Sequence, residues 1–128
     1  MAQQSPEPAV QVLIVDDNED AALSLMMLLE LEDIVAATAA TGQAALELLD
    51  QLSPALMLID IGLPGMDGFE LARRLRARPD TRKTTLVALT GREAHSEDVD
   101  AALFDQFWTK PFDPKKLLAA VRTILERT

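Results

Sequence analysis

Several residue types that build common functional sites are missing or scarce in this sequence. It contains no cysteine, which excludes a disulfide framework and chemistry that depends on a thiolate. The single histidine, His95, has no second histidine or cysteine with which to form a zinc site, so we expect a solvated loop position. No apolar stretch reaches the ~18 residues of a membrane-spanning helix, and the polar start over residues 1–8 lacks the apolar segment of a signal peptide. These absences predict a cytoplasmic domain.

Basic residues are also few. The 128 residues include 12 lysines and arginines against 21 aspartates and glutamates, which gives a net charge of −9. Binding to nucleic acid or to an anionic membrane surface needs clustered positive charge, so we expect neither partner. Hydrophobic residues make up 48% of the chain, which is enough for one folded core at this length. We expect a disordered tail over residues 1–9 and a single domain over residues 10–128.

Short apolar runs alternate with segments of helical spacing. Strands are predicted over residues 10–15, 34–39, 55–60 and 84–89 and within residues 104–109, because each is a short apolar run bounded by turn residues. Helices are predicted over residues 19–31, 41–52, 69–76, 97–103 and 114–126. A strand and a helix repeated five times predict an α/β fold, with helices on both faces of a parallel sheet.

Polar residues stand where four of these strands end. Asp16 and Asp17 follow the first strand, Asp60 ends the third, Thr90 follows the fourth and Lys110 follows the fifth. The carboxyl ends of parallel strands lie at one edge of the sheet, so we expect these residues to converge. Three carboxylates in one place need compensating positive charge. A divalent cation that prefers oxygen ligands, such as Mg²⁺, would supply it together with the lysine.

Phosphoryl transfer to a carboxylate requires this set of groups. Asp60 is predicted to attack phosphorus in line, while the cation and Lys110 neutralise charge on the phosphoryl oxygens and Thr90 donates its hydroxyl to one of them. No general base is needed, because a carboxylate is already ionised at neutral pH. Taken alone, Asp16 and Asp17 suit a helix cap equally well. Their combination with Asp60 and Lys110 favours the metal site.

Four motifs together resemble the receiver domain of bacterial response regulators, the phosphoacceptor module of two-component signalling and phosphorelays. The motifs are Asp16-Asp17, the run from Asp60 to Gly68, Thr90-Gly91 and Lys110-Pro111-Phe112. The resemblance covers about residues 10–126. It implies a flavodoxin-like (βα)5 three-layer sandwich with a parallel five-stranded sheet in the order 2-1-3-4-5.

The resemblance implies a role for each residue of the acidic site. Asp60 matches the phosphoacceptor, which receives its phosphoryl group from a histidine kinase or a histidine phosphotransfer protein. Mg²⁺, or Mn²⁺ in its place, would be held by Asp16, Asp17, Asp60 and the backbone carbonyl of Gly62. The protein would be a signalling module and not an enzyme, although it would catalyse its own phosphorylation and dephosphorylation.

Other positions match the switch that reports phosphorylation. Thr90 and Lys110 match the switch hydroxyl and the phosphate-binding lysine, and Phe107 matches an aromatic side chain that turns inward on activation. The resemblance also implies a cis Lys110–Pro111 peptide bond, a form that proline makes accessible at little cost. Phosphorylation would change the surface of the fourth helix, fifth strand and fifth helix, and so control binding of a downstream protein that the sequence does not identify.

The predicted helix over residues 19–31 carries more apolar residues than one core-facing stripe can use. We therefore expect Leu23 and Met26, and with them Ala22, to form a docking face for the kinase or phosphotransfer protein. Core packing alone is the alternative explanation of this composition.

Three features depart from the family's usual pattern or modify it. Leu103 stands where a glycine often precedes the fifth strand, and Glu32-Asp33 stand where another glycine separates the first helix from the second strand. Leu103 is expected to change how the fourth helix ends, because glycine permits a positive φ at a helix terminus. Arg92 occupies a position that tunes the lifetime of the phosphoryl group in the family.

Three other functions could use some of these residues. A receiver-like domain could act by protein contact without phosphorylation, but all the pocket residues are present. A phosphohydrolase that forms an aspartyl phosphate would carry a carboxylate two residues after the nucleophile, where Gly62 stands. A flavin-binding module would need a Ser/Thr-rich phosphate loop after the first strand, where Asp16 and Asp17 would repel phosphate.

Overall fold

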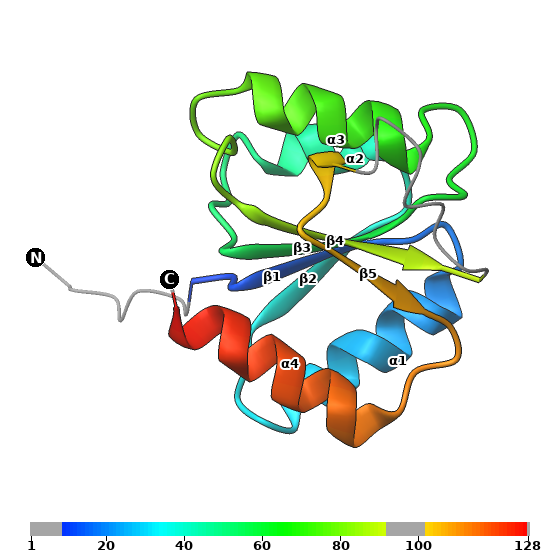
Figure 1. Cartoon of the computed structure of the whole chain (residues 1–128), viewed down its shortest axis with the longest axis vertical. Coiled ribbons are helices and arrows are strands. Elements are labelled where there is room, and N and C mark those ends of the chain that lie inside the picture. Colours follow the sequence, from blue (N-terminus) through cyan, green and yellow to red (C-terminus); the bar gives the residue numbers. More distant parts are fainter. Residues whose placement is uncertain (1–8, 92–101, 128) are drawn as a thin grey trace, which may run out of the picture.

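The computed structural model describes residues 9–91 and 102–127. In this part of the chain, five strands form one parallel sheet in the order β2-β1-β3-β4-β5 (Figure 1). The strands are β1 (Val12–Val15), β2 (Ala36–Ala39), β3 (Leu56–Asp60), β4 (Thr85–Thr90) and β5 (Gln106–Thr109). The helices are α1 (Glu19–Glu30), α2 (Gly42–Leu48), α3 (Gly68–Ala77) and α4 (Pro114–Glu126). The predicted fold class and strand order are confirmed.

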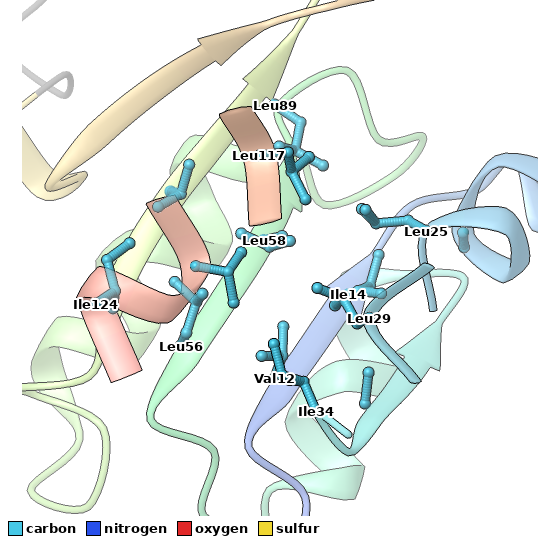
Figure 2. Close-up of a cluster of buried hydrophobic side chains, with 14 residues drawn as sticks. Val12, Ile14, Leu25, Leu29, Ile34, Leu56, Leu58, Leu89, Leu117 and Ile124 are labelled. Carbon is cyan, nitrogen blue, oxygen red and sulfur yellow. The ribbon is translucent and has the colours of Figure 1, made fainter. Parts of the chain in front are cut away.

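The helices form a layer on each face of the sheet. In Figure 1, α1 and α4 lie on one face, and α2 and α3 lie on the other. Figure 2 shows the core under α1 and α4, where Leu25 and Leu29 point toward Ile14 of β1, and Leu117 and Ile124 join the same cluster. The central strands are therefore covered on both sides, which explains why they are continuous apolar runs in the sequence.

A capping side chain stands at the start of each described helix. The caps accept a hydrogen bond from a backbone N–H in the first turn at 2.9–3.0 Å. The four caps are Asn18, Thr41, Asp67 and Asp113. Each satisfies a helix N–H that has no partner within the helix, which stabilises the helix by about 1 kcal/mol. The strand-to-helix turns are thus fixed by local sequence.

The second helix ends earlier than its apolar spacing predicts. It was predicted to reach residue 52, but α2 ends at Leu48. A tighter turn follows, in which the N–H of Asp50 donates to the carbonyl of Glu47 and the N–H of Gln51 donates to the carbonyl of Leu48. These are bonds to the third residue back, as in a 3₁₀ turn, and they close the helix before Pro54.

The connection from α1 to β2 uses an aspartate in a backbone conformation that favours glycine. Asp33 has φ = 62°, and the N–H of Ile34 donates to the carbonyl of Leu29 at 3.1 Å. Aspartate tolerates this region better than most residues, at a cost of about 1 kcal/mol. The missing glycine therefore leaves the turn itself intact.

Leu103 lies in a short 3₁₀ turn that leads into β5, and β5 (Gln106–Thr109) lies within residues 104–109, where a strand was predicted. Arg92, His95 and residues 97–101 of the predicted fourth helix lie outside the described residues, as does the start of the predicted tail, residues 1–8. Over the ranges that are described, no helix is both long and apolar enough to cross a membrane.

Candidate functional site

The polar residues at the strand ends lie at one edge of the sheet. Asp60 is the last residue of β3 and Thr90 is the last residue of β4. Backbone hydrogen bonds continue the sheet by one residue beyond β1 and β5. The N–H of Asp16 donates to the Ala39 carbonyl, and the N–H of Lys110 donates to the Thr90 carbonyl at 2.8 Å. Residues far apart in sequence are thereby brought together by the parallel topology.

Three carboxylates and one ammonium group meet at this edge. Carboxylate oxygens of Asp16, Asp17 and Asp60 lie within 4.8 Å of one another. The Lys110 Nζ lies 3.4 Å from an oxygen of Asp16 and 3.4 Å from an oxygen of Asp60. The lysine balances one of three negative charges, so the ionised cluster carries a net charge of about −2. An oxygen-only set with this charge fits one Mg²⁺ or Mn²⁺ ion.

The three carboxylates differ in their surroundings. Asp16 is buried, Asp17 is exposed, and the Asp60 side chain is 17% exposed. Burial raises the pKa of Asp16, and the neighbouring charge of Asp60 adds to the rise, while the Asn18 N–H and Lys110 act against it. Asp16 is thus held ionised only at an energetic cost that nearby positive charge reduces. Asp60, by contrast, remains accessible from solvent.

The loop after β3 fixes the Asp60 side chain. The Gly62 N–H donates to Asp60 Oδ1 at 2.8 Å, and the Gly68 N–H donates to the Ile61 carbonyl at 3.2 Å. A Cβ on Gly68 would lie 2.6 Å from the Ile61 Cα and 3.0 Å from the Asp60 carbonyl oxygen. Gly65, at φ = 73°, makes the turn between them. The first turn of α3 is therefore packed directly on the backbone that carries Asp60.

Thr90 and Phe107 lie on the neighbouring strands β4 and β5, Thr90 at the end of its strand and Phe107 two residues before the end of its own. Thr90 is buried at the end of β4. Phe107 of β5 is partly buried and contacts the Phe104 ring edge-on, with ring centroids 5.5 Å apart, and Phe104 contacts Phe69 of α3 at 5.6 Å. The Lys110–Pro111 peptide bond is cis, as expected.

The expected docking face on α1 is only partly as predicted. Leu23 is exposed, but Met26 is partly buried against the core and Ala22 is buried, so Ala22 is removed from that face. Met27 and Leu31 are exposed and were not predicted. The sequence could not separate these residues, because nearly every position of the helix is apolar.

A groove of about 570 Å³ lies beside the acidic cluster, between α1 and the start of α4. Asp16 and Lys110 line both the groove and the cluster. Much of the remaining lining is apolar and includes Leu25, Leu28 and Phe112. A partner that fills this groove would lie directly beside Asp16 and Lys110, the two groove residues that adjoin Asp60.

Sequence reasoning missed Arg76, which organises the opposite end of β4 and β5. Its guanidinium donates to the carbonyls of Leu103, Arg82 and Thr84 at 2.7–3.0 Å and to the Asp105 carboxylate at 2.9 Å. The same carboxylate oxygen of Asp105 accepts from a backbone N–H of β4 at 2.8 Å. An arginine on a helix carries no local sign of such distant partners.

Known proteins resemble this chain in sequence and in fold. A family model described as the response regulator receiver domain matches residues 12–122. An uncharacterized 14.6 kDa protein of Leptolyngbya boryana is 38% identical over 116 residues, which are 88% of each chain. The phosphate regulon transcriptional regulatory protein PhoB of Rhizobium meliloti is 36% identical over 91% of this chain, but the match spans only 52% of that protein. The crystal structure of the signal receiver domain of a signal transduction histidine kinase from Syntrophus aciditrophicus superposes with a TM-score of 0.81 at 29% identity, covering 94% of this chain and 92% of the other.

Proposed function

The chain belongs to the response regulator receiver domain family, and we propose that it accepts a phosphoryl group on Asp60 from a phosphohistidine in a Mg²⁺-dependent reaction. The donor would be a histidine kinase or a histidine phosphotransfer protein. Receiver domains are modules of two-component signal transduction, so the phosphorylated chain would act by binding another protein. The observation that carries this proposal is the convergence of the three carboxylates with Lys110 around a partly exposed Asp60.

The proposed reaction exchanges one bond to phosphorus for another. The bond between phosphorus and the imidazole nitrogen breaks, its electron pair returns to the imidazole, and a bond forms between phosphorus and a carboxylate oxygen of Asp60. Asp60 is suited to this attack because a carboxylate nucleophile needs no general base, and because its Oδ1 accepts a hydrogen bond from the Gly62 N–H at 2.8 Å. The Lys110 ammonium, 3.4 Å from Asp60, would neutralise charge that moves onto the phosphoryl oxygens.

Asp16, Asp17, Asp60 and the Gly62 carbonyl are the groups proposed to hold the metal ion. The ion would supply positive charge that stabilises the phosphoryl oxygens in the transition state. The fit is supported by the oxygen-only donor set and by the burial of Asp16 beside Asp60, which favours a nearby cation. Mn²⁺ offers the same ligand preference.

Thr90 and Phe107 are the proposed elements of the switch. In this proposal, the Thr90 hydroxyl donates to the new phosphoryl group, and Phe107 changes its packing against Phe104 in response. Phe107 lines a pocket together with Lys116 and Leu117 of α4, so the surface of β5 and α4 would then differ between the two states. Phe107 is suited to this role because it is only partly buried and meets one ring edge-on.

The phosphodonor is proposed to dock on α1, at the groove between α1 and α4. Asp16 and Lys110 line this groove, so an apolar side chain placed in it would bring the donor imidazole close to Asp60. Leu28 and Phe112 supply apolar surface there. Met26, which the sequence had suggested, packs partly against the core and contributes less.

The experiment is phosphorylation by a small phosphodonor, followed by intact mass spectrometry. Wild type is expected to gain one phosphoryl group with phosphoramidate and Mg²⁺, and none after chelation by EDTA. Asp60→Ala should gain none, whereas Asp67→Ala, which removes a helix cap outside the cluster, should still react. No added phosphoryl mass on folded wild type would refute the proposal, and added mass on Asp60→Ala would place the acceptor elsewhere.

The main alternative is a receiver-like interaction module that is never phosphorylated. The cluster of three carboxylates and Lys110 argues against it, because bringing three carboxylates together costs free energy that a bound cation would offset. A phosphohydrolase is disfavoured because Gly62 provides no acid or base two residues after Asp60.

A further inference from the structure

Apolar side chains are exposed along one side of α1. Across residues 9–91 and 102–127, the large apolar side chains that stand out from the surface are Leu23, Met27 and Leu31, with exposures of 48%, 56% and 79%. They are spaced four residues apart, so they follow one another along one face of the helix and its C-terminal cap. We call these three residues the α1 stripe. Its length is about 12 Å, or two helical turns.

The α1 stripe is a different surface from the groove beside the acidic cluster. The groove is lined by Ala21, Ser24, Leu25 and Leu28 of α1 and by none of the three stripe residues. Ser24 follows Leu23 by one position, which is a rotation of about 100° around the helix. A partner on the stripe therefore faces another direction from a phosphodonor in the groove.

The charge around the α1 stripe has one sign. Residues 1–72 contain no lysine, arginine or histidine, and all 12 basic residues lie in residues 73–128. The stripe is bounded by Glu19 and Asp20 at one end and by Glu30 at the other, all exposed and, among the described residues, without an ion pair. Arg122 of α4 pairs with Glu32, which follows Leu31 directly in the chain.

From this juxtaposition we propose that the α1 stripe is a docking surface for a cationic amphipathic helix of a partner protein. Apolar side chains at intervals of three or four residues would cover Leu23, Met27 and Leu31, as in other helix-on-groove contacts. Lysine or arginine side chains at both ends of that ridge would pair with Glu19, Asp20 and Glu30. This contact uses none of the three carboxylates of the acidic cluster.

Other occupants fit the surface less well. A second copy of this chain would bring the same carboxylates against themselves, which opposes association. Anionic lipid surfaces and nucleic acids would be repelled for the same reason. A cationic helix is the occupant whose charge complements the rim while its apolar face covers the stripe.

The test uses three synthetic helical peptides that carry a fluorescent label. The first has a leucine ridge with flanking lysines, the second has the same ridge with flanking glutamates, and the third keeps the lysines but has a serine ridge. Fluorescence anisotropy with wild-type protein should show binding of the first peptide alone, weakened by salt. Leu23→Ser/Met27→Ser leaves the net charge unchanged and should weaken this binding by about tenfold or more. Glu30→Gln should weaken this binding by several-fold. Glu126→Gln, which changes an exposed side chain of α4, should not weaken it.

Several results would overturn the proposal. One is equal binding of the lysine peptide to wild type and to Leu23→Ser/Met27→Ser, since charge alone would then explain it. A second is binding of the glutamate peptide to wild type as tightly as the lysine peptide. A third is a wild-type dimer, detected by sedimentation, that the double substitution dissociates. Circular dichroism should show the double variant folded, because both side chains are exposed in wild type. Phosphorylation of Asp60 by phosphoramidate, measured on the same variant, should be unchanged, so a failure at Asp60 and a failure at the stripe are distinguished.

Discussion

The contact between Gly68 and the chain after β3 yields the sharpest prediction. A Cβ on Gly68 would meet the Ile61 Cα at 2.6 Å and the Asp60 carbonyl oxygen at 3.0 Å. Both are backbone atoms, so no rotamer change can relieve the overlap, and either α3 or the β3 end must move. We estimate about 3 kcal/mol for this forced shift, less about 1 kcal/mol that alanine gains over glycine in a helix.

Gly68→Ala should therefore lower the free energy of unfolding by about 2 kcal/mol, or Tm by roughly 8 °C for a domain of this size. The assay is urea unfolding followed by circular dichroism, with a two-state fit. Gly91→Ala is the matched control, because no described atom beyond its chain neighbours lies within 4 Å of the new Cβ. It should change stability by no more than about 0.5 kcal/mol. Ile61→Ala should not rescue Gly68→Ala, since the overlap is with backbone.

The same substitution should slow the phosphorylation of Asp60, because the displaced backbone carries that carboxylate. The reasoning is refuted if Gly68→Ala is as stable as Gly91→Ala, or if trimming the Ile61 side chain restores stability. In either case, the close approach of α3 to the β3 end would not be a constraint on the site.

Three further predictions follow from other contacts. Asp33→Gly should raise the free energy of unfolding by about 1 kcal/mol in chemical denaturation, since glycine removes the cost of φ = 62°; a loss of stability would contradict it. Arg76→Ala should cost about 3 kcal/mol, through four lost hydrogen-bond partners. Its control Arg74→Ala, which removes one exposed pair with Glu70, should cost no more than about 0.5 kcal/mol; equal losses would refute the role of Arg76. The raised pKa of Asp16 means that its stabilising contribution is present below its ordinary pKa of 3.8 and is lost as pH rises through the higher folded value. Asp16→Asn should therefore raise the Tm of metal-free protein at pH 7 and weaken the stabilisation by Mg²⁺, and a lower Tm at pH 7 would contradict this explanation.

Much of the fold and the membership of the acidic cluster could be predicted from the sequence. The apolar runs that became β1, β3 and β4 are continuous because both faces of those strands are covered. Asp16 and Asp60 could be placed together because parallel strands share one carboxyl edge, so topology alone brings them into reach. No knowledge of side-chain packing was needed for that step.

The errors have physical causes that lie outside local sequence. Apolar residues continue at helical spacing after Leu48, where α2 ends. A buried turn uses the same apolar residues as a buried helix, so the spacing does not mark the helix end. Which residues of α1 face outward depends on how the helix is rotated on the sheet, and that rotation left Met27 exposed and Ala22 buried. A helix that is apolar on nearly all sides gives no periodic signal from which to read its orientation.

By itself, the sequence determined the order of the five strands along the chain and the identity of the groups that meet at the acidic edge. These depend on short-range patterns and on a topology with few alternatives. Only the tertiary structure decided the distances, namely that Lys110 lies 3.4 Å from both Asp16 and Asp60. It also decided that Gly68 packs against the backbone of Asp60, because such contacts join segments whose separation depends on the packing of the whole core.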